Sequence, residues 1–142
     1  MKIMALDIGK TRTGVAMSDL SESLASPVGI IESYQMEKLI VGVIKMVEQY
    51  NIEKIIVGLP IKADGQVGEM GEMINEFVRL LKLRIEIEIE FLNEAYTTVI
   101  AVKKLHENKK NSKKQKSLID AAAAAVLLQD YLDTMKNKRI TE

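Results

Sequence analysis

The chain has 142 residues, 47% of them hydrophobic and 28% charged, which suffices for a single domain, residues 1–142, with a sizeable core. It has no cysteine, which excludes disulfides, thiolate metal sites and thiol catalysis, and no apolar run near the ~20 residues of a membrane span. The 20 Lys and Arg balance 20 Asp and Glu, which argues against an indiscriminately basic nucleic-acid binder. The N-terminus resembles a strand rather than a signal peptide, so we expect a cytoplasmic protein without a membrane partner.

The first predicted element is a hairpin of two strands, residues 2–7 and 12–18, joined by a tight turn that contains Gly9. Gly9 and Gly14 permit the backbone to approach a ligand closely. Asp7 ends the first strand, and a strand buried on both faces has little reason to end in a carboxylate unless the charge is used. We therefore expect Asp7 to hold a metal ion or to lie beside a phosphate. The alternative is that Asp7 caps its own turn.

The next predicted elements are a strand, a helix and a second apolar strand. Pro27 precedes a strand at residues 28–31, and Ser33 is placed to cap a helix whose apolar residues recur at helical spacing until Asn51. Residues 54–59 form a short apolar run, which is typical of a buried parallel strand. Pro60 ends this run, and residues 64–65 form a turn.

The second half of the chain alternates in the same way between helix and strand. An amphipathic helix covers residues 70–81, and residues 84–92 alternate apolar side chains with glutamates, as an edge strand with its glutamates facing water does. Helices follow at about 97–106 and 118–135. This order predicts an α/β fold with a five-stranded mixed sheet of order 3-2-1-4-5, an antiparallel second strand and helices on both faces, which is the ribonuclease H topology.

Lysines dominate residues 103–116, where seven lysines accompany a single glutamate. The segment lacks strong apolar periodicity, so we expect an exposed basic loop that holds nucleic-acid backbone. The alternative is a loop that is rich in lysine only for solubility.

Glu94 and Asp120 are the candidate partners of Asp7, because paired Mg²⁺ or Mn²⁺ ions need several clustered carboxylates. Glu94 follows the fifth strand, and Asp120 opens the last helix on its sheet-facing side. Each of the two residues also has a purely structural interpretation. Glu94 precedes a predicted helix, whose positive N-terminal end stabilises a nearby carboxylate. Asp120 completes a Ser-x-x-Asp capping box with Ser117. At about 4.8 Å per strand, the fifth strand lies about 9–10 Å from the first. Asp7 and Glu94 therefore share a metal only if sheet twist and the longer glutamate bridge this gap.

Four motifs in order resemble the YqgF family of ribonuclease-H-like proteins, described as pre-16S rRNA nucleases and as Holliday junction resolvases. They are Asp-Ile-Gly and Arg-Thr-Gly-Val-Ala within residues 7–16, Gly-Leu-Pro and Asp-Gly within 58–65, Glu and Thr-Thr within 94–98, and Asp-Ala with Leu-Leu and Tyr-Leu within 120–132. One motif departs from the family, because Asn93-Glu94-Ala95-Tyr96 stands where the family has Asp-Glu-Arg-Leu. An acid and an arginine beside Glu94 are thereby lost.

The resemblance implies a metal-dependent phosphodiester hydrolase that uses Mg²⁺ or Mn²⁺ and has Asp7, Glu94 and Asp120 as its catalytic, metal-binding residues. A metal on Asp7 and Asp120 would activate water, and one shared with Glu94 would stabilise the leaving 3′ oxygen. The implied substrate is structured RNA, specifically the 5′ end of precursor 16S rRNA. The expected nucleic-acid contacts are Lys10, Arg12, Thr97, Thr98, Lys109, Lys110, Lys113, Lys114 and Lys116.

Three alternatives to an RNA nuclease remain open. The first is a Holliday junction resolvase on branched DNA. The second is a nucleic-acid-binding module without catalysis, which the zero net charge and the altered motif at Asn93 and Ala95 favour. The third is a sugar-kinase or actin-like ATPase, which opens with a similar hairpin but needs two such domains. A symmetric resolvase is expected to be a homodimer, whereas an RNA nuclease with one site need not be one, so both a monomer and a homodimer remain open.

Overall fold

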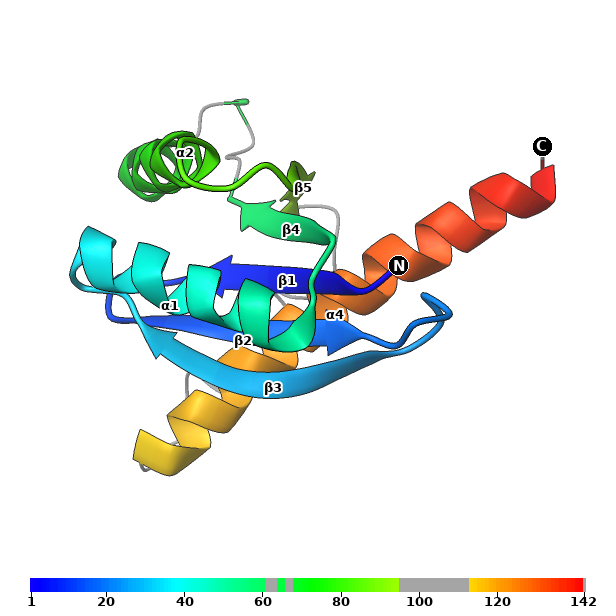
Figure 1. The fold of residues 1–142 in the computed structure, drawn as a ribbon, viewed down its shortest axis with the longest axis horizontal. Coiled ribbons are helices and arrows are strands. Elements are labelled where there is room, and N and C mark those ends of the chain that lie inside the picture. The colour runs from blue at the N-terminus through cyan, green and yellow to red at the C-terminus, as the bar shows by residue number, and fades with distance from the viewer. Residues whose placement is uncertain (61–63, 66–67, 95–112, 142) are drawn as a thin grey trace.

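The computed structural model describes residues 1–60, 64–65, 68–94 and 113–141. The strands are β1 (Ile3–Ile8), β2 (Arg12–Ser18), β3 (Ala25–Glu32), β4 (Lys54–Leu59) and β5 (Glu88–Asn93). The helices in these ranges are α1 (Met36–Tyr50), α2 (Gly68–Lys82) and α4 (Lys113–Thr141). Helices α1 and α2 cover one face of the sheet, and α4 crosses the other face (Figure 1).

The five strands form one sheet in the order β3-β2-β1-β4-β5. Strand β2 is antiparallel to β1 and β3, whereas β4 is parallel to both β1 and β5. This arrangement confirms the predicted strand order, the antiparallel second strand and the helices on both faces. Because β1, β4 and β5 run in the same direction, their carboxyl ends meet at one edge of the sheet, where side chains from distant parts of the sequence converge.

Side chains that alternate along the strands separate into two hydrophobic cores. The core on the α1–α2 side includes Leu6, Ile8, Val15, Val57 and Phe77. The core on the α4 side includes Ala5, Ala16, Ile56, Ala124 and Leu128. Even positions of β1 therefore point to α1 and α2, and odd positions point to α4. Asp7 lies between Leu6 and Ile8, so its side chain points to the α4 side.

Helix α4 lies close to the sheet because small residues face each other where they meet. A Cβ added to Gly14 would overlap the main-chain oxygen of Asp120 and lie 3.1 Å from the main-chain nitrogen of Ala121. Ala123 and Ala124, the next small residues of α4, are fully buried, and Ala124 packs in the core that includes Ala16 of β2. Further along the helix, Tyr131 Oη accepts a hydrogen bond of 2.7 Å from Nζ of Lys54, the first residue of β4. These contacts fix the position of α4 at both ends of the sheet.

Two predictions for the region of β3 and α1 are wrong in detail. Strand β3 begins at Ala25, opposite Ser18, rather than at residue 28. Pro27 lies inside it, which an edge strand tolerates because one side of its backbone needs no partner strand. Ser33 does not cap α1; the capping position is Gln35, without a side-chain hydrogen bond. Ser33 Oγ instead donates to the main-chain oxygen of Gly9 at 2.7 Å.

The predicted strand at residues 84–92 starts too early. The main-chain nitrogen of Arg84 donates to the oxygen of Leu81 at 2.9 Å, so this part of the alternating pattern closes a turn after α2. Strand β5 begins at Glu88, opposite Lys54, where its partner strand β4 also begins. Glu88 and Glu90 face water as predicted, but they also lie 3.5 and 3.8 Å from Lys54 Nζ.

The last helix is longer than the predicted 118–135, because α4 begins at Lys113 and continues to Thr141. Lys113, Lys114 and Lys116 therefore belong to a helix, and the expectation of a loop through residues 103–116 is wrong for them. Lysine and glutamine are good helix formers, and these residues extend a helix that packing on the sheet already stabilises. The predicted helix at 97–106 and the rest of the basic segment lie outside the described residues. No helix in the described ranges is both long and apolar enough to cross a membrane.

Candidate active site at the carboxyl ends of the parallel strands

Asp7 lies at the carboxyl end of β1, on the α4 side of the sheet. Only 4% of its surface is exposed. Its neighbour across the β1–β2 pair is Gly14, the residue against which α4 packs. The missing side chain at Gly14 therefore brings the backbone of α4 close to the strand position beside Asp7.

Glu94 directly follows β5 and is 6% exposed. Its side chain lies over Gly58 of β4, because a Cβ added to Gly58 would be 2.5 Å from Glu94 Oε1 and 3.0 Å from its Cγ. Gly58 follows Val57, the partner of Leu6 in β1, so it lies on the strand next to Asp7. The glutamate side chain thus lies over β4, the strand between β5 and β1.

Asp120 lies inside α4, well beyond the first residue of that helix, Lys113. Ser117 is therefore not at a helix start, and the capping-box alternative for Asp120 is wrong. The side chain of Asp120 forms an ion pair with Arg12, whose Nε donates to Asp120 Oδ2 at 2.9 Å. Both side chains are 27% exposed. Two of the predicted site residues are thus in contact with each other.

The three predicted carboxylates gather on the same side of the sheet, although they do not form a complete metal site. Asp7 and Glu94 are nearly buried, and each has at least one interaction partner within the protein. Among the residues described, no three acidic or histidine side chains are close enough together to hold a metal ion. The donor chemistry nevertheless fits Mg²⁺ or Mn²⁺, which prefer carboxylate oxygens. The open space over Gly58 accommodates the Glu94 carboxylate beside β1, so Asp7 and Glu94 fit such an ion.

The β1–β2 turn beside this site is held in one conformation by three hydrogen bonds. Gly9 N donates to Arg12 O at 2.9 Å, Ser33 N donates to Thr11 O at 2.9 Å, and Ser33 Oγ donates to Gly9 O. A Cβ on Gly9 would lie 2.6 Å from the Arg12 oxygen, so the turn requires glycine there. Gly9 therefore shapes the turn from which the two predicted phosphate contacts project.

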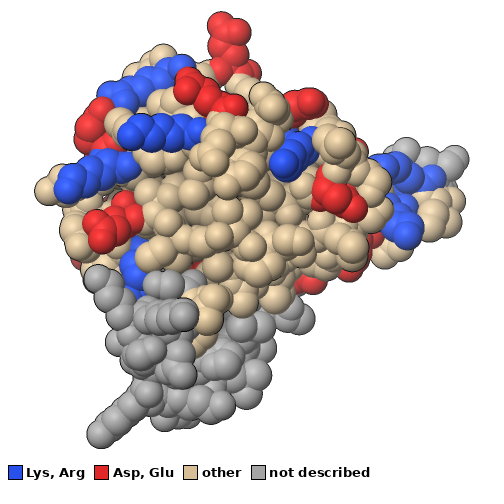
Figure 2. All heavy atoms as spheres, turned by 60° about the horizontal axis from the view of Figure 1, so that its bottom comes forward, with Lys and Arg blue, Asp and Glu red and all other residues tan. Residues whose placement is uncertain are grey.

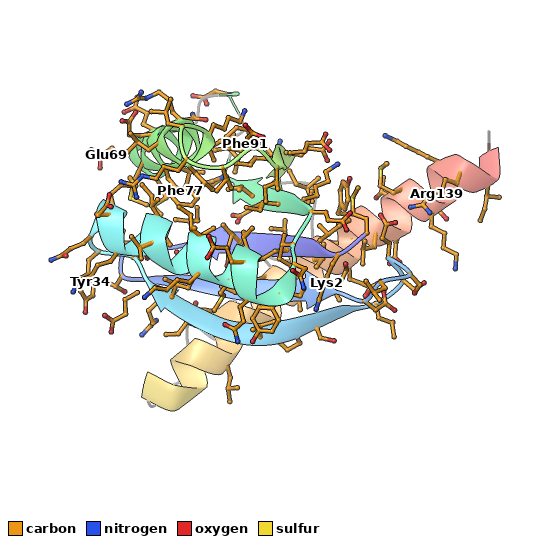
Figure 3. The ribbon with its side chains drawn as sticks, viewed as in Figure 1. Lys2, Tyr34, Glu69, Phe77, Phe91 and Arg139 are labelled. Carbon is orange, nitrogen blue, oxygen red and sulfur yellow. The ribbon has the colours of Figure 1, made fainter. Side chains whose placement is uncertain are left out.

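These two predicted contacts, Lys10 and Arg12, lie in different surroundings. Arg12 meets Asp120 on the α4 side. Lys10 lines a pocket of about 410 Å³ together with Ser33, Tyr34 and Glu69, near the starts of α1 and α2. Figure 3 shows Tyr34 and Glu69 at the same end of the molecule, the end at which β1 terminates. A nucleic acid that follows this edge of the sheet would meet both cations.

The other predicted nucleic-acid contacts are less well placed by the structure. Thr97, Thr98, Lys109 and Lys110 lie outside the described residues. Lys113, Lys114 and Lys116 lie in the first turns of α4. On the face shown in Figure 2, basic and acidic side chains are interspersed around a neutral area, in keeping with a net charge of zero.

Sequence reasoning missed Gly58 and the pairing of Arg12 with Asp120. The signal for Gly58 was present, because a glycine inside a buried strand marks a close approach by another group. No local signal predicts the Arg12–Asp120 pair, since the two residues are 108 positions apart.

The chain is similar to known proteins along nearly its whole length. Residues 1–134 match the model of the RuvX family, described as Holliday junction resolvase. A relative from Thermoanaerobacter pseudethanolicus is 39% identical over 139 residues, which are 97% of this chain and all of the relative. One from Natranaerobius thermophilus is 38% identical over 138 residues, 97% and 98% of the two chains. Both are named "Putative pre-16S rRNA nuclease".

Two solved structures have a similar fold despite low sequence identity. RuvC of T. thermophilus, solved in complex with a Holliday junction substrate, superposes with a TM-score of 0.61 at 11% identity, covering 96% of each chain. The fowlpox virus resolvase, solved with Holliday junction DNA, gives a TM-score of 0.59 at 16% identity over 95% of this chain and 99% of that one. These likenesses confirm the ribonuclease-H-like fold.

Proposed function

The chain belongs to the RuvX family, and from this premise we propose that it is a nuclease that hydrolyses phosphodiester bonds with the help of a divalent cation. The observation that carries the proposal is the placement of two nearly buried carboxylates at the same edge of the sheet. Asp7 ends β1, and Glu94, which follows β5, lies with its side chain over Gly58 of the intervening strand β4. Carboxylate oxygens are the ligands that Mg²⁺ and Mn²⁺ prefer in proteins, so the residue types at this edge of the sheet are suited to such a cation.

Asp7 and Glu94 would hold the cation, with Asp120 as a further ligand once its carboxylate leaves Arg12. A bound Mg²⁺ or Mn²⁺ supplies Lewis acidity and lowers the pKa of its water. The protein itself positions the carboxylates and the phosphate-binding side chains. Strand β1 fixes Asp7, Gly58 admits Glu94, and Lys10 and Arg12 offer charged donors to phosphate oxygens beside the site.

For the substrate we propose the 5′ end of precursor 16S rRNA, cleaved in the cytoplasm during ribosome biogenesis. The support is the name shared by the relatives that match nearly the whole chain. Branched DNA is the second candidate, because the family description names a Holliday junction resolvase. The two differ in assembly, since resolving a junction symmetrically calls for a homodimer and cutting one RNA strand does not.

The test compares wild type with Asp7→Asn and Glu94→Gln on precursor 16S RNA and on four-way DNA junctions, each with Mg²⁺, Mn²⁺ or EDTA. We expect wild type to cut only with metal, and each variant to lose at least about a hundredfold in rate while still binding the nucleic acid. Glu48→Gln is the matched control, because Glu48 is exposed on α1, on the opposite face of the sheet.

Two results would contradict the proposal. Undiminished cleavage by Asp7→Asn would remove the carboxylate mechanism. Tight binding without cleavage by wild type under every metal condition would favour the binding-module alternative. The ratio of the rates on RNA and on junctions decides between the two substrates.

A further inference from the structure

The ion pair between Arg12 and Asp120 joins the first hairpin to the last helix at the candidate site. Asp120 has its main chain packed on Gly14, which lies two residues after Arg12 in β2. Arg12 and Gly14 are on the same side of that strand, because side chains alternate and Ala16 belongs to the core on the α4 side. The guanidinium therefore approaches Asp120 from the strand next to Asp7.

Contacts other than this pair hold α4 on the sheet. Leu127 and Leu128 are fully buried against the strands, and Tyr131 accepts a hydrogen bond from Lys54. With 27% of each side chain exposed, the Arg12–Asp120 pair is a partly solvated ion pair. Such pairs contribute little to the free energy of folding. The pair is thus weak enough to be exchanged for another partner.

We propose that Arg12 is a positioning residue that holds the Asp120 carboxylate until a divalent cation takes that carboxylate, after which the released guanidinium binds a phosphate of the nucleic acid. The inference rests on the proposed nuclease function. It adds an exchange of partners that makes Asp120 a ligand only when the cation is present.

Charge explains why the exchange takes place. The guanidinium of Arg12 and a divalent cation are both positive and repel each other, so each weakens the attraction of the Asp120 carboxylate for the other. Without the cation, Arg12 offsets the negative charge of Asp120 beside Asp7. The freed guanidinium offers several N–H donors in a planar arrangement that suits phosphate oxygens.

The exchange predicts that cation and nucleic acid bind cooperatively. Each ligand removes one partner of the same ion pair, so each lowers the free energy needed to bind the other. In the absence of nucleic acid, the guanidinium competes with the cation for Asp120 and weakens its binding.

The test measures Mn²⁺ binding to the full chain by electron paramagnetic resonance, without nucleic acid, for wild type, Arg12→Ala and Arg12→Lys. We expect Arg12→Ala to bind Mn²⁺ about threefold to fivefold more tightly than wild type. This factor corresponds to the strength of a partly exposed ion pair, which the cation no longer has to break. Arg12→Lys keeps the charge and should stay near wild type. Arg84→Ala is the control, because Arg84 forms an exposed ion pair with Glu37 away from the carboxylates.

A second measurement follows nucleic-acid affinity with and without Ca²⁺, under conditions where a gel shows the strands intact. The cation should increase the affinity of wild type by at least about fivefold and that of Arg12→Ala by less. Equal Mn²⁺ affinity of wild type and Arg12→Ala would overturn the exchange while leaving the nuclease proposal standing. Absence of Mn²⁺ binding in both proteins would overturn both proposals. Weaker Mn²⁺ binding with a lowered melting temperature in Arg12→Ala would assign the pair a structural role instead.

Discussion

At the scale of single residues, two glycines determine where the carboxylates lie. Gly14 lets the backbone of α4 reach β2 at Asp120, and Gly58 leaves room for the Glu94 side chain above β4. Neither glycine has its backbone in the left-handed region. Their role is therefore the space that a missing side chain leaves, which is a common reason for glycine inside a strand.

Gly58→Ala tests this role of empty space. The added Cβ would lie 2.5 Å from Glu94 Oε1 and 3.0 Å from Leu127 Cδ2, so the carboxylate must move away. We expect cleavage to fall by about tenfold to a hundredfold, since a misplacement of about 1 Å has effects of this size. The melting temperature should change little, because the closest atom belongs to a side chain that can rotate.

Gly29→Ala is the matched control for that experiment. Gly29 also lies in a strand, β3, but a Cβ there meets nothing within 4 Å. Cleavage by Gly29→Ala should equal that of wild type. An equal loss of cleavage in both variants would show that the alanine acts through strand stability rather than through Glu94.

At the scale of elements, α4 is the part of the fold that closes the candidate site. It crosses β1, β2 and β3 (Figure 1), and the alanines near Asp120 and the leucines that follow bury its sheet-facing side. At the far end of the sheet, Lys54 joins α4 to the sheet through Tyr131 and approaches Glu88 and Glu90 of β5. The position of Asp120 thus depends on contacts made along the whole helix.

The Lys54 contact predicts an alkaline limit to stability. Burial opposes the ammonium, but the hydrogen bond to Tyr131 and the carboxylates of Glu90 and Glu88 outweigh it and raise the pKa of Lys54 above its usual 10.5. A raised pKa in the folded protein means that the contribution to stability is complete below pH 10.5 and declines as the pH rises through the higher folded value.

Urea unfolding at about pH 9 and about pH 11 measures this contribution. The difference in free energy of unfolding between wild type and Lys54→Met should be smaller at the higher pH. Lys45→Met, at an exposed position on α1, should show a constant difference from wild type. A difference for Lys54→Met that grows with pH would contradict the assigned direction.

At the scale of the whole molecule, the distribution of charge matters more than the net charge of zero. Acidic and basic side chains mix on the face shown in Figure 2. Lys113 and Lys114 begin α4, the helix that carries Asp120, so they lie on the same element as a candidate ligand. Nucleic-acid binding is therefore expected to depend on a few local lysines rather than on a positive field around the molecule.

Salt dependence tests whether these lysines bind the backbone. Each phosphate contact contributes about one unit to the slope of log affinity against log salt concentration. Replacing Lys113 and Lys114 by Gln should lower the slope by about two and weaken binding similarly for different sequences. Replacing Lys38 and Lys45 of α1 by Gln changes the charge equally and should leave the slope unchanged. Equal slopes for the two double variants would show that Lys113 and Lys114 make no phosphate contacts.

The sequence by itself determined the strand order, the solvent-facing glutamates of the last strand and the identity of the candidate carboxylates. These properties depend on residue types at short spacing and on the order of strands and helices along the chain, which sets the sheet. Local patterns were less reliable where tertiary contacts compete. Ser33 has the chemistry of a helix cap, yet its hydroxyl bonds to Gly9 across the hairpin turn.

Only the tertiary structure decided how the candidate site is assembled. The reach of Glu94 over Gly58 and the ion pair of Arg12 with Asp120 join residues 36 and 108 positions apart, and their geometry depends on how closely β4 and α4 approach β1. Such distances follow from packing across the whole sheet, which no short stretch of sequence contains. Asp7 was therefore recognisable from its own hairpin, whereas its neighbours Gly58 and Arg12 acquired their roles only when the chain folded.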